Sequence, residues 1–142
     1  MGDAASARPA DGDLWRVVEA TVYNVILPSL DDPWARAAAV QLVGVARYAQ
    51  RRDEDPTAAN AAEVAAVIAG LTHNPLVVQP LADDPHSVLD AAARSLAAAV
   101  ADAGADGDEV RAVLRPLLVR QLDDELAITA PLVAAFRGQL DE

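Results

Sequence analysis

Apolar residues recur every three or four positions along most of this chain, and no stretch alternates with the two-residue period of a half-buried strand. One short β-prone run, Val77–Gln79, has no second strand with which to pair. The pattern therefore predicts an all-α protein, a compact bundle of about five to six helices.

Acidic residues and prolines divide this pattern into helices. The first helix is expected to begin at a cap, Asp11 or Asp13, and to end at Pro28, because an interior proline removes a hydrogen bond and clashes with the preceding turn. The second helix is expected over about residues 32–52. It is the most apolar segment, and a helix that is apolar nearly all round is usually central. We therefore expect it to be packed on several sides.

Later start and stop signals predict the remaining helices. Asp55 is expected to cap the third helix, Asp84 to cap the fourth, and Pro116 to bend or break the fifth. A short last helix is expected to begin at Pro131. The expected ranges are about 55–70, 85–102, 108–127 and 131–140.

The motif Pro-x-x-Asp-Asp-Pro occurs twice, at residues 28–33 and 80–85. In both copies the second aspartate stands where an N-cap belongs, and the following proline occupies the first helical position. The carboxylate accepts free amide hydrogens of the first turn, and its charge suits the positive end of the helix dipole. We interpret each copy as a hinge between two helices. The alternative is a cation bound by the adjacent pairs, Asp31–Asp32 or Asp83–Asp84.

Length, charge and composition narrow the class of protein. The 142 residues suit one domain, and we expect a single helical domain over residues 12–142 after a disordered lead over residues 1–11. A formal net charge of −11 disfavours a nucleic-acid partner. No apolar run approaches about 18 residues, so no membrane span is expected. The absence of cysteine suits a cytoplasmic protein, and the lysine-free, arginine-rich composition indicates a bacterial one.

Residue types that usually carry catalysis or bind metals are scarce. The only histidines, His73 and His86, belong to no Glu-x-x-His motif. The chain has neither a Gly-x-Ser-x-Gly elbow nor a glycine-rich phosphate loop, and it has no lysine that could form a Schiff base. We therefore expect no metal and no cofactor, and the sequence favours a protein that is not a self-sufficient enzyme.

Polar residues inside the two most apolar helices are the better candidates for a site. Glu19 and Tyr23 are four positions apart, and Arg36 and Arg47 are eleven apart, nearly on one stripe of a helix. If these arginines are buried, they need carboxylate partners, for which Glu63 is a second candidate beside Glu19. They form either structural ion pairs or an anion or partner-protein site. The candidate ligand- or partner-binding residues are Glu19, Tyr23, Asn24, Arg36, Gln41 and Arg47.

The fifth helix has a broad apolar face, made of Val113, Leu114, Leu117, Leu118, Leu122 and Leu126. Such a face serves either the protein's own core or a helical interface with a second chain. The interface stays an alternative to the core, because the largest side chains, Trp15 and Trp34, both lie at predicted helix starts.

Residues 25–47, "VILPSLDDPWARAAAVQLVGVAR", resemble a family of small bacterial helical proteins. The resemblance covers about residues 14–52, and the residues that match the family are Leu27, Pro28, Ser29, Leu30, Arg36 and Arg47. The family often has an asparagine near the middle of the second helix, where this chain has Val40. Its members are typically encoded beside aminoglycoside-phosphotransferase-like kinases and acyl-CoA dehydrogenases. The resemblance implies an accessory subunit of a kinase that acts on hydroxyacyl-CoA intermediates.

Together these features predict a cytoplasmic, non-catalytic accessory or interaction subunit that supports a phosphotransferase-like kinase in (hydroxy)acyl-CoA metabolism. Its expected partner is another protein or a second copy of the chain, and neither nucleic acid nor a membrane. A small-molecule-binding helical protein is one alternative. A minor enzyme with Glu19 as its base is the other.

Overall fold

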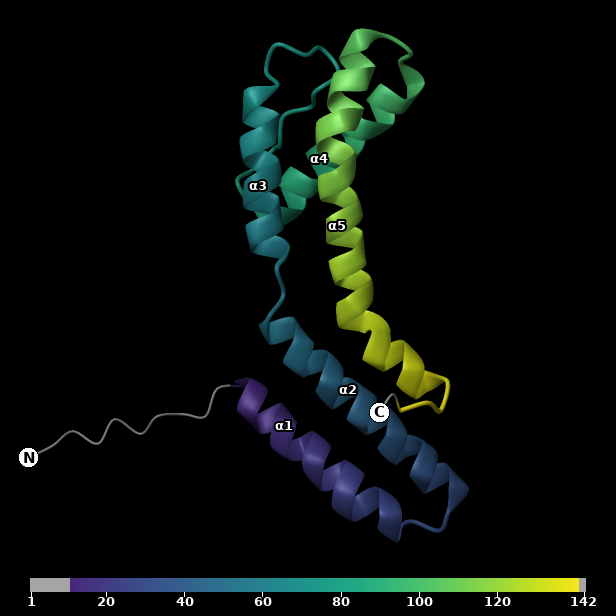
Figure 1. Cartoon of the computed structure of the whole chain (residues 1–142). Helices are drawn as coiled ribbons and strands as arrows, with labels where there is room; N and C mark the ends of the chain where they lie inside the picture. The colour runs from purple at the N-terminus through teal and green to yellow at the C-terminus, as the bar shows by residue number, and fades with distance from the viewer. Residues whose placement is uncertain (1–10, 141–142) are drawn as a thin grey trace, which may run out of the picture. The chain divides into compact units, whose positions relative to one another are not determined.

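The structure, a computed structural model, describes residues 11–140, and these form helices and no strand, which confirms the all-α class. No helix within this range combines the length and the hydropathy that a membrane span requires. The α-helices are α1 (Asp11–Thr21), α2 (Pro33–Asp53), α3 (Thr57–Gly70), α4 (Pro85–Ala101) and α5 (Ala105–Phe136), as Figure 1 shows. A π-helical segment, Val22–Ile26, and a 3₁₀ turn, Leu27–Ser29, follow α1.

The chain packs as two units. Unit 1 comprises Met1–Asp55 and Leu126–Glu142, and unit 2 comprises Pro56–Glu125, so α5 contributes to both. The single helical domain expected over residues 12–142 stays a prediction. The expected disordered lead lies outside the described residues, apart from Asp11, which is the first residue of α1.

In unit 1, α1 and α2 lie side by side and are joined by a short turn (Figure 1). Val22, Ala39 and Val43 form the centre of their contact, with Val18 and Leu27 packed around it. The last part of α5 approaches α2 where α2 has a glycine. A Cβ atom on Gly44 would overlap the Cβ of Ala135, so only glycine permits this approach.

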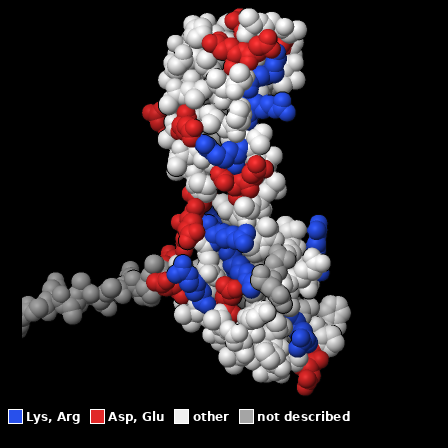
Figure 2. All heavy atoms as spheres, in the orientation of Figure 1, with Lys and Arg blue, Asp and Glu red and all other residues white. Residues whose placement is uncertain are grey.

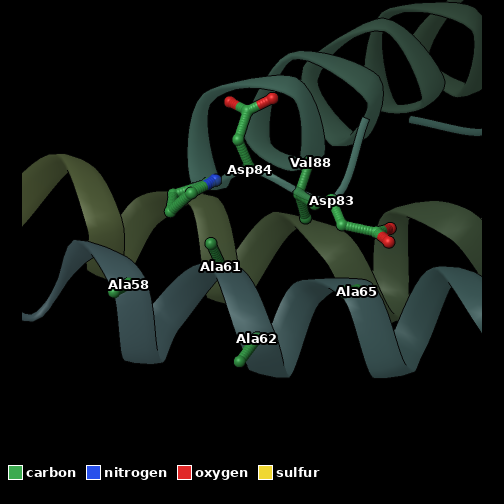
Figure 3. A pocket seen from close by; sticks show the side chains of 8 residues that line it. Ala58, Ala61, Ala62, Ala65, Asp83, Asp84 and Val88 are labelled. Carbon is green, nitrogen blue, oxygen red and sulfur yellow. The ribbon is translucent and has the colours of Figure 1, made fainter. Parts of the chain in front are cut away.

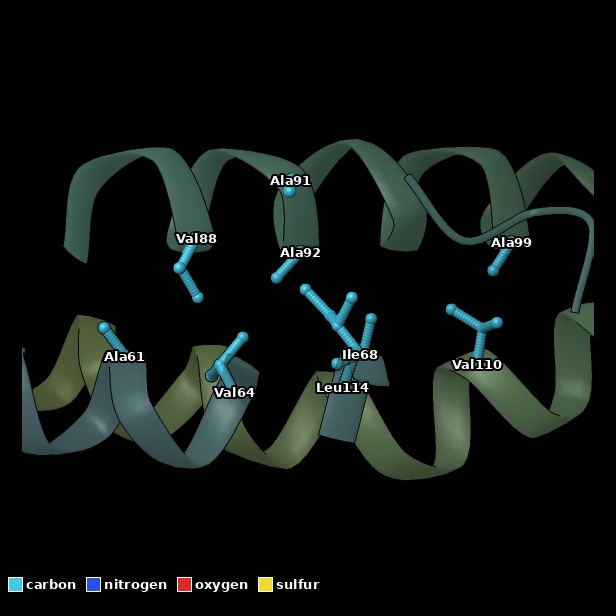
Figure 4. Packing of buried hydrophobic residues seen from close by; sticks show 9 residues of the cluster. All are labelled: Ala61, Val64, Ile68, Val88, Ala91, Ala92, Ala99, Val110 and Leu114. Carbon is cyan, nitrogen blue, oxygen red and sulfur yellow. The ribbon is translucent and has the colours of Figure 1, made fainter. Parts of the chain in front are cut away.

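In unit 2, apolar side chains of α3, α4 and the first half of α5 meet in one core, shown in Figure 4. Valine and alanine dominate it, and Ile68 and Leu114 are its largest fully buried side chains. The connection after α3 packs on this core. The Val78 amide donates to the buried Ser95 hydroxyl over 2.8 Å, and no described residue of Val77–Gln79 is in a strand.

The two Asp-Pro hinges cap helices as expected. The Asp32 carboxylate accepts the amide hydrogen of Ala35 at 2.7 Å, and the Asp84 carboxylate accepts that of Ser87 at 3.0 Å. Asp84 also accepts the Ser87 hydroxyl, and these hydrogen bonds lower the pKa of its carboxyl group. The expectation for α3 was wrong, since Pro56 takes the N-cap position instead of Asp55.

Helix α5 corrects two other expectations. It begins at Ala105 and runs through both Pro116 and Pro131, so the break at Pro116 and the separate last helix were wrong. A proline leaves the carbonyl four residues earlier without its helical donor. For Pro131 that carbonyl belongs to Ala127, and the Arg51 guanidinium of α2 donates to it. For Pro116 the affected turn is exposed, so water can replace the donor.

We predict that Gly44→Ala destabilises the protein by about 1–3 kcal/mol, because the added methyl group overlaps Ala135 and approaches the Pro131 carbonyl oxygen. The measurement is the free energy of unfolding in urea. Gly70→Ala is the matched control, because a Cβ there meets nothing within 4 Å and alanine is the better helix former. Equal stability of Gly44→Ala and wild type would contradict the close approach of α2 and α5.

Candidate functional site

Three of the predicted site residues meet between α1 and α2. Arg47 Nε donates to Glu19 Oε1 over 2.6 Å, and Gln50 Nε2 donates to Glu19 Oε2 over 2.7 Å. The Arg47 guanidinium carbon lies 5.9 Å from the centre of the Tyr23 ring, within cation–π range. We call Glu19, Tyr23, Arg47 and Gln50 the Glu19 cluster.

Helical spacing explains why these side chains meet. Glu19 and Tyr23 are four residues apart and therefore share a face, and Arg47 and Gln50 are three residues apart on the helix opposite. The Glu19 and Arg47 side chains are each 25% exposed, so water screens their ion pair only in part. Gln50 was missed in the sequence, because nothing local marks it out from other glutamines.

The electrostatics of Glu19 argue against catalysis by this residue. Burial raises the pKa of its carboxyl group, but the hydrogen bonds from Arg47 and Gln50 and the charge of Arg47 outweigh burial and lower the pKa below its ordinary value of 4.5. A general base works best with a pKa near the operating pH. Because both oxygens of Glu19 also accept hydrogen bonds, the geometry disfavours the minor enzyme considered above.

Arg36 has a different role from Arg47. Its guanidinium donates to the carbonyl oxygens of Leu27 and Leu30, at 2.9 and 3.0 Å, and so holds the turn between α1 and α2. Eleven residues along a helix span about 16 Å. One small anion therefore cannot contact both arginines, so Arg36 and Arg47 do not form a single anion site.

The other candidates lie outside the Glu19 cluster. Asn24 lies within the π-helical segment, and its Nδ2 donates to the Ala20 carbonyl of α1 over 2.9 Å. Gln41 is exposed on α2. Glu63 was wrong as a partner for the α2 arginines, because it pairs with Arg120 within unit 2.

The second aspartate pair borders a small pocket between α3 and the start of α4, of about 150 Å³. Alanines of α3 form its floor, and the carboxylates of Asp83 and Asp84 point in different directions (Figure 3). No group of three potential metal ligands occurs in the part of the chain that the structure describes. This geometry favours the hinge interpretation over the cation.

A buried polar network in unit 2 was missed in the sequence. Asn60 donates to Gln121 and Asp124, each over 2.8 Å, and Gln121 donates to Thr57 and Glu125, each over 2.9 Å. Because these buried amides have partners, the network fixes how α3 lies against α5. The signal available in the sequence was a polar residue, Asn60, within the apolar repeat of α3.

Helix α1 and the π-helical segment after it have a stripe of exposed apolar residues beside those that pack on α2. Leu14, Val17, Thr21 and Val25 follow one another at helical spacing, and we call them the outer face of α1. All four are exposed, Val17 to 63%. Residues 20–30 include no charged residue, and the surface over that end of α1 is uncharged in Figure 2.

Comparison with known proteins does not assign the chain to a family. A scan against protein-family models finds no match, and searches of curated proteins and of solved structures find none either. The resemblance over residues 14–52 therefore stays a prediction, and function has to be argued from the geometry of the described residues.

We predict that the Glu19 cluster makes stability depend on pH. Because the pKa of Glu19 is lowered in the folded state, its contribution is fully present above pH 4.5 and is lost as the pH falls through the folded-state value. The difference in unfolding free energy between wild type and Glu19→Gln should therefore shrink on acidification. Glu54→Gln removes the same charge from an exposed position of unit 1 and is the control. A difference that is independent of pH would contradict the ion pair.

Proposed function

We propose that this chain is a non-catalytic accessory subunit that binds an apolar helical surface of a partner enzyme through the outer face of α1. The observation that carries the proposal is that the apolar band of α1 is wider than the part that packs on α2. Val18 and Val22 pack on the α2 side, and the outer face of α1 is exposed.

The amount of apolar surface suits a binding face. Burying one Leu or Val side chain completely contributes about 1.5–3 kcal/mol, so three such residues on one stripe favour association. Trp34, in the first turn of α2, is 84% exposed. Tryptophan is among the residues that most often dominate interface energetics. Exposed apolar residues at single positions are common, but a continuous stripe is a mark of an interaction site.

The polar residues support a non-catalytic protein. Glu19 is held as a carboxylate by Arg47 and Gln50, and Arg36 is occupied by two backbone carbonyls. Each of these side chains stabilises unit 1. A formal net charge of −11 would steer a basic partner surface towards the chain.

The class of partner comes from the resemblance. It implies a phosphotransferase-like kinase in (hydroxy)acyl-CoA metabolism, in the cytoplasm of a bacterium. The same resemblance covers α1, the following turn and α2, which include the outer face of α1 and Trp34.

We predict that Val17→Glu abolishes binding to the partner kinase and leaves folding intact, because Val17 is exposed and its charged replacement would be desolvated in the complex. The measurement is co-purification of the kinase with the tagged chain from the native cells, together with the kinase rate with and without the chain. Leu81→Glu, at an exposed leucine of unit 2, is the matched control and should behave as wild type.

Two results would contradict this proposal. One is a kinase rate that is unchanged when the chain is removed. The other is co-purification that survives Val17→Glu, because the partner would then bind a surface other than the outer face of α1.

A further inference from the structure

Unit 2 has an apolar groove between α4 and α5 that the proposed function does not use. Its volume is about 520 Å³, within the range of small-molecule sites. Val100, exposed to 70%, and Leu122, exposed to 53%, keep it open to solvent. Its lining consists of Leu96 and Val100 of α4 and Arg111, Arg115, Leu118, Val119 and Leu122 of α5.

The two arginines of the groove differ in what they bind. The Arg111 guanidinium donates to the carbonyl oxygens of Ala99 and Asp102 and to the Asp108 carboxylate, so it closes the turn between α4 and α5. Arg115 makes no hydrogen bond or ion pair with any residue between 11 and 140. It is therefore a cation beside an apolar surface, with its charge available to a ligand.

We infer that this groove binds an anionic amphiphile, a medium-length acyl chain with a carboxylate head, and that Arg115 receives the head. The apolar residues match the chain, and the guanidinium matches the carboxylate in charge and in planar geometry. This inference goes beyond the accessory role, since its site lies in unit 2 and involves no residue of the outer face of α1.

The dimensions of the groove suit a chain of this size. Arg115 and Leu122 are seven residues apart on α5, about 10 Å along the helix. A fully buried methylene group favours binding by about fourfold, and an open groove buries about half of each methylene. Affinity should therefore rise by about twofold for each added methylene until the chain extends beyond Leu122.

The test is titration calorimetry of the full chain with octanoate, decanoate and dodecanoate. We expect saturable binding that strengthens with chain length. Arg115→Gln should weaken decanoate binding by about two- to fivefold, the range for an exposed ion pair, and leave decanol binding unchanged. Arg94→Gln is the matched control, because Arg94 pairs with Asp90 on α4 and does not line this groove.

A second pair of variants locates the site independently of charge pairing. Leu122→Glu should weaken decanoate binding at least about tenfold, through lost apolar contact and a like charge in the groove. Leu122 is half-exposed, so the folded state tolerates the substitution. Val133→Glu makes the same kind of change at a similarly exposed position of α5 in unit 1 and should leave decanoate affinity unchanged.

Three results would overturn the inference. The first is the absence of saturable binding of decanoate and dodecanoate. The second is decanol binding as tightly as decanoate to the wild type. The third is a chain that self-associates through this groove, shown by sedimentation in which Leu122→Glu alone converts a dimer to a monomer, because a second copy would then be the occupant.

Discussion

The close approach of α2 and the end of α5 is the constraint on which unit 1 depends. At Gly44 the two helices come so near that a single methyl group would overlap Ala135. All of unit 2 lies between these residues in the sequence, so the contact closes a long loop whose entropic cost grows only slowly with its length. Once the helices are this close, Arg51 of α2 donates to the Ala127 carbonyl. This hydrogen bond replaces the one that Pro131 cannot make.

The parts of the fold that could be predicted from the sequence are those with local causes. N-capping needs only a carboxylate and the amides of the next turn, so Asp32 and Asp84 were identified correctly without knowledge of the tertiary structure. The continuity of α5 had no local cause. Its hydrogen bond lost at Pro131 is replaced by Arg51, a residue far away in the sequence, and proline rules alone predict a break there.

In the candidate site, too, only the features with local causes could be predicted from the sequence. Helical spacing was enough to predict that Glu19 and Tyr23 share a face. Which carboxylate pairs with Arg47 depends on tertiary packing. Helix α1 lies against α2 and brings Glu19 to Arg47, whereas Glu63 is on α3 and pairs with Arg120. The role of Arg36 could not be predicted, because its partners are backbone carbonyls, which every residue has.

The division of the chain between the units has a consequence for synthesis on the ribosome. Unit 2 is one uninterrupted stretch, Pro56–Glu125, whereas unit 1 needs residues from both sides of that stretch. Domains generally fold as units while the chain emerges, usually the N-terminal one first. We expect the reverse order here, because Ala135, which packs on α2 at Gly44, leaves the exit tunnel only after all of unit 2. Until then the side of α2 that the end of α5 covers stays open to water and to other nascent-chain contacts.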